Sequence, residues 1–247
     1  MPITSTTPEP GIVAVTVDYP PVNAIPSKAW FDLADAVTAA GANSDTRAVI
    51  LRAEGRGFNA GVDIKEMQRT EGFTALIDAN RGCFAAFRAV YECAVPVIAA
   101  VNGFCVGGGI GLVGNSDVIV ASEDATFGLP EVERGALGAA THLSRLVPQH
   151  LMRRLFFTGG HRGRGHLAAL RLGARGGVPR SAGRGRFAGG PRHRRQRHPS
   201  HPRRQGDAEL HRRATGQCEL PDGARFYFEL NLAGVADEHR DAFVKKS

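Results

Sequence analysis

A run of apolar residues from Ala94 to Val113 is the feature that most constrains how this chain can fold, because burying it removes a large apolar surface from water. At 20 residues the run is as long as a membrane-spanning helix, which needs about 20 residues. It contains five glycines, Pro96 and Asn102, however, and so many helix-weakening residues do not suit a lone spanning helix. We therefore predict a buried strand that turns into a buried helix, and no association with a membrane.

Patterns typical of strands and helices alternate through the first 158 residues. Short β-branched or apolar runs predict strands at 12–17, 48–52, 97–101 and 118–121, and apolar residues near helical spacing predict helices at 27–41, 73–93 and 142–157. Ser27 begins the first of these helices and is its candidate N-cap. The alternation predicts an α/β fold, with residues 1–159 forming the core that would hold an active site.

The positive charge of the chain is concentrated in one segment. Residues 159–225 hold 16 Arg and no Lys against four acidic residues, a local net charge of +12, so the rest of the chain carries −5 of the total of +7. Between 161 and 204 the sequence is dominated by Arg, Gly, Pro, His and Ala without apolar periodicity, which is typical of a low-complexity segment. The basic character therefore belongs to this segment and not to the predicted core.

Two interpretations of the basic segment remain open. One is a non-catalytic RNA-binding protein that uses this segment as an arginine-rich arm. Phe187 is the only aromatic residue between Phe157 and Phe226, however, which leaves little for base stacking. We favour a frameshift over residues 160–225, because Arg outnumbers Lys 27 to 4 as in a GC-rich gene, and such a gene read out of frame yields Arg, Gly, Pro and Ala. Residues 226–247 regain apolar residues at helical spacing, which predicts a genuine C-terminal helix.

The cysteines and the N-terminus bear on the compartment. The four cysteines form no C-x-x-C pair and no zinc-ligand spacing, so we expect a reduced chain in the cytoplasm and no bound metal. The first residues lack a basic stretch followed by an apolar one, so we predict no secretory signal.

Two glycine-bearing stretches, FNAGVD (58–63) and NGFCVGGG (102–109), each follow a strand-like run. Two such turns can aim two backbone N–H groups at one carbonyl oxygen, the arrangement that stabilises an oxyanion. Gly109, Gly111 and Gly114 also satisfy the dinucleotide pattern G-x-G-x-x-G. The preceding strand ends well before Gly109 and the next begins near Val118, which leaves too little chain for the crossover that this pattern requires. A purely structural glycine turn remains the alternative.

The sequence resembles the crotonase superfamily, the enoyl-CoA hydratase/isomerase family. The resemblance is carried by FNAGVDIKEM, PVIAAVNGFCVGGGIGL, SDVIVASEDATFGLPEVERG and the terminal ADEHRDAF. It implies a spiral of ββα units with a C-terminal helical region, an acyl-CoA substrate, no cofactor beyond the CoA of the substrate, and a homotrimer or hexamer.

The resemblance also implies roles for particular residues. The thioester carbonyl would sit between the N–H groups of Ala60 and Gly108, with Gly108 at a helix start whose dipole favours an anion. Glu131, in FGLPE, would be the catalytic acid/base. Further residues would bind CoA. The stretch beside the pantetheine and adenine would supply Ala60, Asp63, Ile64 and Lys65, and the stretch opposite it would supply Val22, Asn23 and Ala24.

One position departs from the family pattern. Hydratases of the family carry a second Glu after the glycines, and Gly111 stands at the matching position. With one main acid/base left, the resemblance implies either a double-bond isomerase or a C–C hydrolase, and plain hydration of an enoyl-CoA is disfavoured. We expect the missing side chain to enlarge the site for a cyclic acyl group. The sequence is therefore interpreted as an actinobacterial hydrolase that opens a keto-bearing ring in steroid breakdown, with an isomerase or hydratase of fatty-acid oxidation as the alternative.

Two further titratable residues are candidates. Glu133 would point away from Glu131 if this stretch is extended, and a salt bridge is then its expected role. His142 lies near the motif, and its ordinary pKa would suit acid/base catalysis, but a lone His more often has a structural role.

Overall fold

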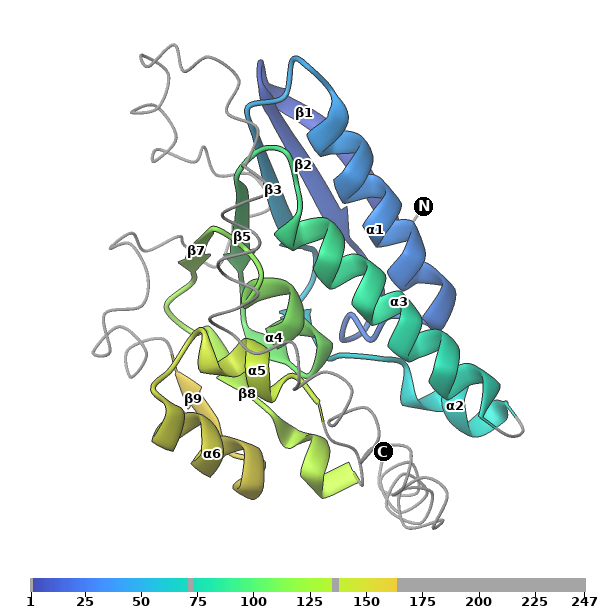
Figure 1. Cartoon of the computed structure of the whole chain (residues 1–247), viewed down its shortest axis with the longest axis vertical. Helices are drawn as coiled ribbons and strands as arrows, with labels where there is room; N and C mark the ends of the chain where they lie inside the picture. The colour runs from blue at the N-terminus through green and yellow to red at the C-terminus, as the bar shows by residue number, and fades with distance from the viewer. Residues whose placement is uncertain (1, 71–72, 135–137, 164–247) are drawn as a thin grey trace.

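The computed structural model of the protein describes residues 2–70, 73–134 and 138–163 (Figure 1). The basic segment and the C-terminal helix that we predicted at 160–225 and 226–247 lie outside the described residues, except for 160–163. Within this part of the chain, no helix is both long enough and apolar enough to span a bilayer.

The strands form two sheets. The larger sheet has the order β1-β2-β3-β5-β7, in which β2, β3, β5 and β7 run parallel and β1 is antiparallel to β2. Its strands are β1 (Ile3–Glu9), β2 (Ile12–Val17), β3 (Ala48–Ala53), β5 (Val97–Val101) and β7 (Val118–Ala121). The smaller sheet has the order β4-β6-β8-β9, formed by β4 (Gly57–Asn59), β6 (Phe104–Val106), β8 (Thr126–Gly128) and β9 (His161–Gly163). In it β4, β6 and β8 are parallel, and β9 is antiparallel to β8.

The chain passes between the two sheets in a repeating order. Each of β3, β5 and β7 in the large sheet is followed at once by β4, β6 or β8 in the small sheet, and a helix follows each pair. These helices are α2 (Ile64–Arg69) and α3 (Thr74–Tyr91), then α4 (Gly108–Val113), then the short 3-10 helix η1 (Pro130–Arg134). The result is the predicted spiral of ββα units, and the expectation of an α/β fold is confirmed.

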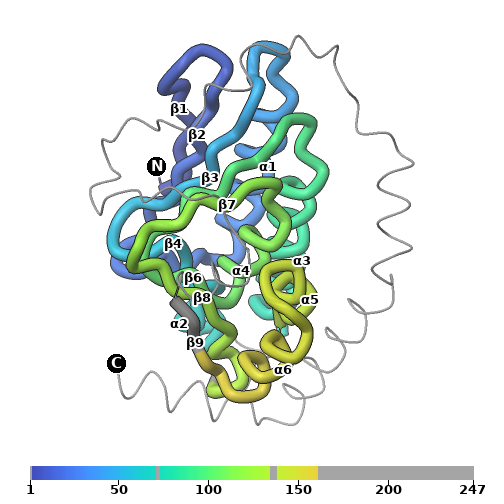
Figure 2. Tube along the Cα trace, turned by 90° about the vertical axis from the view of Figure 1, so that its left-hand side faces the viewer, coloured from blue at the N-terminus to red at the C-terminus, as the bar shows by residue number. Residues whose placement is uncertain are grey.

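Two long helices cover one face of the large sheet. α1 (Ser27–Ala42) and α3 lie side by side along it in both views (Figures 1 and 2). α1 buries Trp30, Leu33 and Val37, which recur at helical spacing, and they join one core with Val15 of β2 and Leu51 of β3. The same core continues into the small sheet through the buried residues of its strands.

The structure confirms the predicted strands within a residue, but it corrects two predictions about helices. Ser27 is the first residue of α1 and not its N-cap, because Pro26 occupies the cap position and offers no side-chain hydrogen bond. The single helix predicted at 142–157 is two helices, α5 (Ala140–Ser144) and α6 (Gln149–Thr158). Pro148 is the N-cap of α6, and a proline there cannot continue the preceding helix.

Candidate active site

The two glycine stretches meet where β4 and β6 end. β4 and β6 are parallel neighbours, so the turns that follow them leave the small sheet at the same edge. A Cβ built on Gly61 would lie 3.3 Å from the backbone nitrogen of Gly108, and one built on Gly107 would lie 3.4 Å from the Gly61 Cα. Both Gly61 (φ +88°) and Gly107 (φ +58°) adopt left-handed conformations that favour glycine. Glycine is thus required here both for conformation and for close approach.

The directions of the backbone N–H groups decide which of them can bind a ligand. The N–H of Ala60, expected to hold the carbonyl, donates to Asn23 O at 3.3 Å, and the N–H of Gly61 donates to Asn59 Oδ1 at 2.8 Å. A parallel bridge pairs Val62 with Ile25 through the two residues that flank Val62. In it Ile25 N–H donates to Gly61 O at 2.9 Å and Asp63 N–H donates to Ile25 O at 3.0 Å.

The N–H of Val62 is therefore turned away from Ile25. Within the described residues, neither this N–H nor that of Gly108, the first residue of α4, has a hydrogen-bond partner. Gly61, in its left-handed conformation, lies between Ala60 and Val62 and lets their N–H groups point in different directions. Sequence reasoning missed Val62, because only the pairing with Ile25 distinguishes it from Ala60.

Glu131 lies beside the glycine turns. It belongs to η1, which follows β8, the neighbour of β6 in the small sheet. Its Oε1 lies 2.9 Å from the position of a Cβ on Gly107, and its Oε2 is buried. The turns after β4, β6 and β8 thus bring Val62, Gly108 and Glu131 to one edge of the sheet.

The predicted salt bridge of Glu133 assumed that its stretch is extended. The stretch is instead a 3-10 helix. The Glu133 side chain is exposed and lies against Gly159 at the end of α6, with its Oε1 2.9 Å from the position of a Cβ there. Among the described residues it forms no ion pair.

The space beside Gly111 is filled, which corrects the expectation that the missing side chain enlarges the site. A Cβ on Gly111 would lie 2.5 Å from Cε1 and Cε2 of Phe87, so the ring of this α3 residue covers the position. The Phe87 ring packs edge-on against Trp30, with centroids 5.9 Å apart, and against His142 at 5.0 Å. Nothing in the sequence links Phe87 to Gly111, which is 24 residues further along.

This packing gives a direct prediction. Gly111→Ala is expected to lower the free energy of unfolding by about 1–3 kcal/mol, because its Cβ overlaps the Phe87 ring. In a Phe87→Ala background the same change should cost less than half as much, and urea denaturation of the four chains measures the difference. Gly138→Ala is the matched control, because a Cβ there meets nothing within 4 Å. Equal costs of Gly111→Ala in both backgrounds would contradict the packing.

His142 belongs to a buried polar network at the end of α4. The Asn115 Nδ2 donates to Gly111 O at 2.6 Å and lies 3.0 Å from His142 Nδ1, and the Asn115 Oδ1 accepts from the Arg145 guanidinium. Because Arg145 can only donate, it fixes the orientation of the amide, so Nδ1 of His142 accepts and its proton resides on Nε2. Burial, with a smaller effect of Arg145, lowers the pKa of His142 to about 4, so the ring is neutral at neutral pH.

The residues predicted to bind CoA lie on two adjacent segments. The Asn59 Nδ2 donates to Asn23 O at 2.7 Å, which places residues 22–24 beside the start of the 60–65 stretch. The Asn23 side chain itself donates to Glu54 O at 2.7 Å and to Gly57 O at 2.8 Å, so it holds the loop together. Val22 and Ala24 flank it and are half-buried.

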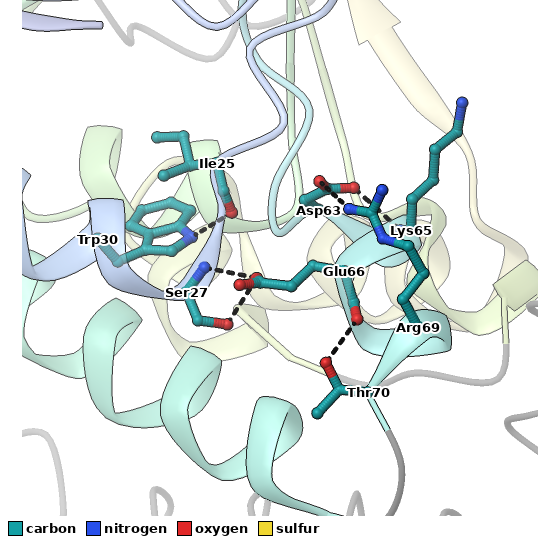
Figure 3. A network of polar contacts seen from close by, with 8 residues as sticks. All are labelled: Ile25, Ser27, Trp30, Asp63, Lys65, Glu66, Arg69 and Thr70. Carbon is teal, nitrogen blue, oxygen red and sulfur yellow. Dashed lines mark hydrogen bonds and ion pairs between the residues drawn. The ribbon is translucent and has the colours of Figure 1, made fainter. Parts of the chain in front are cut away.

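The other segment leads into α2. Asp63 is the N-cap of α2 and accepts from Lys65 N at 2.9 Å (Figure 3). Ile64 is half-buried, and the Lys65 side chain is exposed. Across the described residues, no group of three or more His, Cys, Asp or Glu side chains is placed to hold a metal ion.

Known proteins resemble this chain in sequence and in fold. Residues 7–167 match the family model described as enoyl-CoA hydratase/isomerase. Over the full length of both chains, the protein is 75% identical to a "(7aS)-7a-methyl-1,5-dioxo-2,3,5,6,7,7a-hexahydro-1H-indene-carboxyl-CoA hydrolase" of Mycobacterium tuberculosis. It is 59% identical to a protein of the same name from Rhodococcus jostii, over 99% of this chain and 95% of that one. Among solved structures, an enoyl-CoA hydratase/carnitine racemase from Magnetospirillum magneticum superposes with a TM-score of 0.65 at 27% identity, covering 70% of this chain and 67% of that one.

Proposed function

The chain belongs to the enoyl-CoA hydratase/isomerase family, and on this basis we propose that it is a hydrolase that opens one ring of a bicyclic keto-acyl-CoA. The observation that carries the proposal is the match over nearly the whole chain to two relatives that are both named as hydrolases of a methyl-dioxo-hexahydroindene-carboxyl-CoA. A fused five- and six-membered carbocycle with a methyl group at the ring junction corresponds to the last two rings of a steroid. The proposed substrate is therefore an acyl-CoA of steroid breakdown.

The chemistry follows from the substituents in that name. The ketone at C1 lies next to C7a, which carries the methyl group and no hydrogen. Water adds to C1, the C1–C7a bond breaks, and C1 becomes a carboxylate. In the proposal the thioester is attached to C4 of the remaining C3a=C4 double bond, so the electron pair of the broken bond passes to C7a and through this double bond into the thioester carbonyl. A proton then returns to carbon, so one water is consumed and nothing is oxidised or reduced.

The residues at the edge of the small sheet divide this reaction between them. In the proposal, the N–H groups of Val62 and Gly108 hold the thioester oxygen as negative charge develops on it. Support comes from their place in the fold, since both are turned away from the local backbone hydrogen bonds. Glu131 takes a proton from the attacking water and returns it to carbon. Its carboxylate lies beside Gly107, the residue that precedes Gly108. One carboxylate is enough for this sequence of steps, which fits a glycine at position 111.

The proposal also covers the CoA moiety of the substrate and the assembly of the protein. The CoA moiety lies along residues 22–24 and 60–65, with the exposed Lys65 available to its phosphates. We also propose that the protein forms a homotrimer or hexamer and acts in the cytoplasm. An assembly would cover Phe31 of α1 and Ile77 and Phe84 of α3, whose side chains are exposed.

Product analysis in ¹⁸O-labelled water tests the function. With the bicyclic dioxo-indene-carboxyl-CoA as substrate, we expect a product heavier by one labelled water, with the ring opened and the label in a new carboxylate. Label in a hydroxyl group on an intact bicycle would indicate hydration instead, and a product of unchanged mass would indicate isomerisation. Either outcome would overturn the hydrolase.

A further inference from the structure

A carboxylate from α2 caps the first turn of α1. The Oε2 of Glu66 accepts from Ser27 N at 2.6 Å and from Ser27 Oγ at 2.8 Å (Figure 3). Pro26, at the cap position, cannot supply a side-chain acceptor, so the cap of α1 comes from another helix. We call this pair of hydrogen bonds the Glu66–Ser27 clasp. A negative charge at a helix N-terminus is also favoured by the helix dipole.

The clasp closes one end of a ladder of hydrogen bonds between two segments. The segments are residues 23–27, before and at the start of α1, and residues 59–66, from β4 to α2. From one end to the other, the rungs are Asn59 Nδ2 to Asn23 O, Ala60 N to Asn23 O, Ile25 N to Gly61 O, Asp63 N to Ile25 O, and the clasp. Val62 lies within this ladder, and its N–H points outward because its neighbours make the rungs. The ladder therefore sets the direction of the Val62 N–H.

The same turn of α1 also contacts the other N–H donor. Trp30 donates from Nε1 to Ile25 O at 3.1 Å, which anchors the indole to the ladder (Figure 3). The far edge of its ring lies beneath Gly108, with Cη2 2.7 Å from the position of a Cβ there. Ser27 and Trp30 are three residues apart on one helix. The first turn of α1 therefore contacts the surroundings of both N–H donors, that of Val62 through the ladder and that of Gly108 through the indole ring.

The clasp joins α2 to the first turn of α1. None of its residues is fully buried. The ion pair of Arg69 with Asp63 is 3.9 Å long and the Arg69 side chain is 74% exposed, so solvent screens it. Without the clasp, α2 and the end of the ladder would lose these two hydrogen bonds to α1.

We propose that Glu66 is a positioning residue for the reaction, because its clasp with Ser27 fixes the separation and direction of the Val62 and Gly108 N–H donors. This proposal rests on the proposed function, in which those donors bind the thioester oxygen. A shift of about 1 Å in such a donor can cost about a hundredfold in rate. The effect should therefore appear in kcat and in the polarisation of the carbonyl, and only weakly in KM.

The test compares Glu66→Ala with Glu66→Gln. We expect Glu66→Ala to lower kcat about 10- to 100-fold with KM changed less than about threefold. Glu66→Gln should keep most of the activity, because its amide oxygen can accept both hydrogen bonds. Asp32→Ala is the matched control, since it removes a partly exposed carboxylate of α1 whose hydrogen-bond partner among the described residues is Lys28. Ser27→Ala, which removes one of the two hydrogen bonds, should give an intermediate loss and covers the case that Glu66→Ala does not fold.

A spectroscopic measurement separates this proposal from the function on which it rests. The infrared stretch of a ¹³C-labelled thioester carbonyl, in a bound saturated acyl-CoA that cannot react, should fall in the unaltered protein because two N–H groups polarise it. Glu66→Ala should lose at least half of that fall. If the unaltered protein gives no fall, the oxyanion site of the proposed function is wrong, and the clasp has nothing to position. If Glu66→Ala gives the same fall and the same kcat as Asp32→Ala, the clasp is only structural and the proposal is overturned.

Discussion

Glu131→Gln is expected to lower kcat for the bicyclic keto-acyl-CoA by about a thousandfold, because a positioned acid/base contributes about 10²–10⁴-fold. Glutamine keeps the size of the side chain beside Gly107 but can neither take a proton from water nor return one to carbon. Substrate binding relies on the backbone N–H groups and the CoA contacts, so KM should change little. Steady-state kinetics with mass detection of the ring-opened product measures both constants.

Glu133→Gln is the control for this change. Glu133 is two residues away in the same 3-10 helix, but its exposed side chain lies against Gly159 and not against Gly107. We expect its substitution to leave kcat within about twofold of the starting value, as for most exposed positions. Should Glu131→Gln retain more than a tenth of the activity, the proton carrier would have to be another group.

Removing one backbone N–H at a time should identify the second donor to the thioester oxygen. Replacing Val62 by its α-hydroxy acid analogue exchanges that N–H for an ester oxygen, and we expect kcat to fall by about 10²–10³-fold, the effect of losing one oxyanion donor. The same exchange at Ala60 deletes only a 3.3 Å hydrogen bond to Asn23 O and should cost much less. Single-turnover measurements on both semisynthetic proteins make the comparison.

The two exchanges also control for each other. Each weakens the preceding carbonyl as an acceptor, so a general effect of the ester would appear in both proteins. A larger loss at Ala60 than at Val62 would return the role to Ala60, as the family resemblance first implied. Equal and small losses at both positions would argue that Gly108 alone binds the oxygen.

The four strands that the sequence predicted match because their signals are local, whereas the polar strand β1 and the three-residue strands of the small sheet were not predicted. The runs 12–17, 97–101 and 118–121 are β-branched or apolar over the whole of their length, and they match β2, β5 and β7 at both ends. The helix predicted at 142–157 was wrong because an apolar period continues across Pro148, which separates α5 from α6. Ser27 likewise has the composition of an N-cap, but the preceding proline takes that position.

The site was predictable only where the sequence motifs themselves determine the course of the backbone. The convergence of the two glycine stretches and the position of Gly108 at the start of α4 follow from the order of strands and turns. The direction of the Val62 N–H does not, because it depends on the pairing with Ile25, which lies 37 residues earlier. The ring of Phe87 over Gly111 and the clasp between Glu66 and Ser27 are contacts between separate helices. Composition and spacing carry no signal for them.

The ring over Gly111 restricts how this enzyme could change its chemistry by successive substitutions. A carboxylate at position 111 would collide with Phe87, and removing Phe87 first would leave a void between Trp30 and His142. Each single step is therefore harmful by itself, and only the pair of changes makes room for a second acid. Ring opening and two-carboxylate hydration differ at one position of the shared motif. A change from one to the other must nevertheless pass through a harmful single substitution, which is sign epistasis.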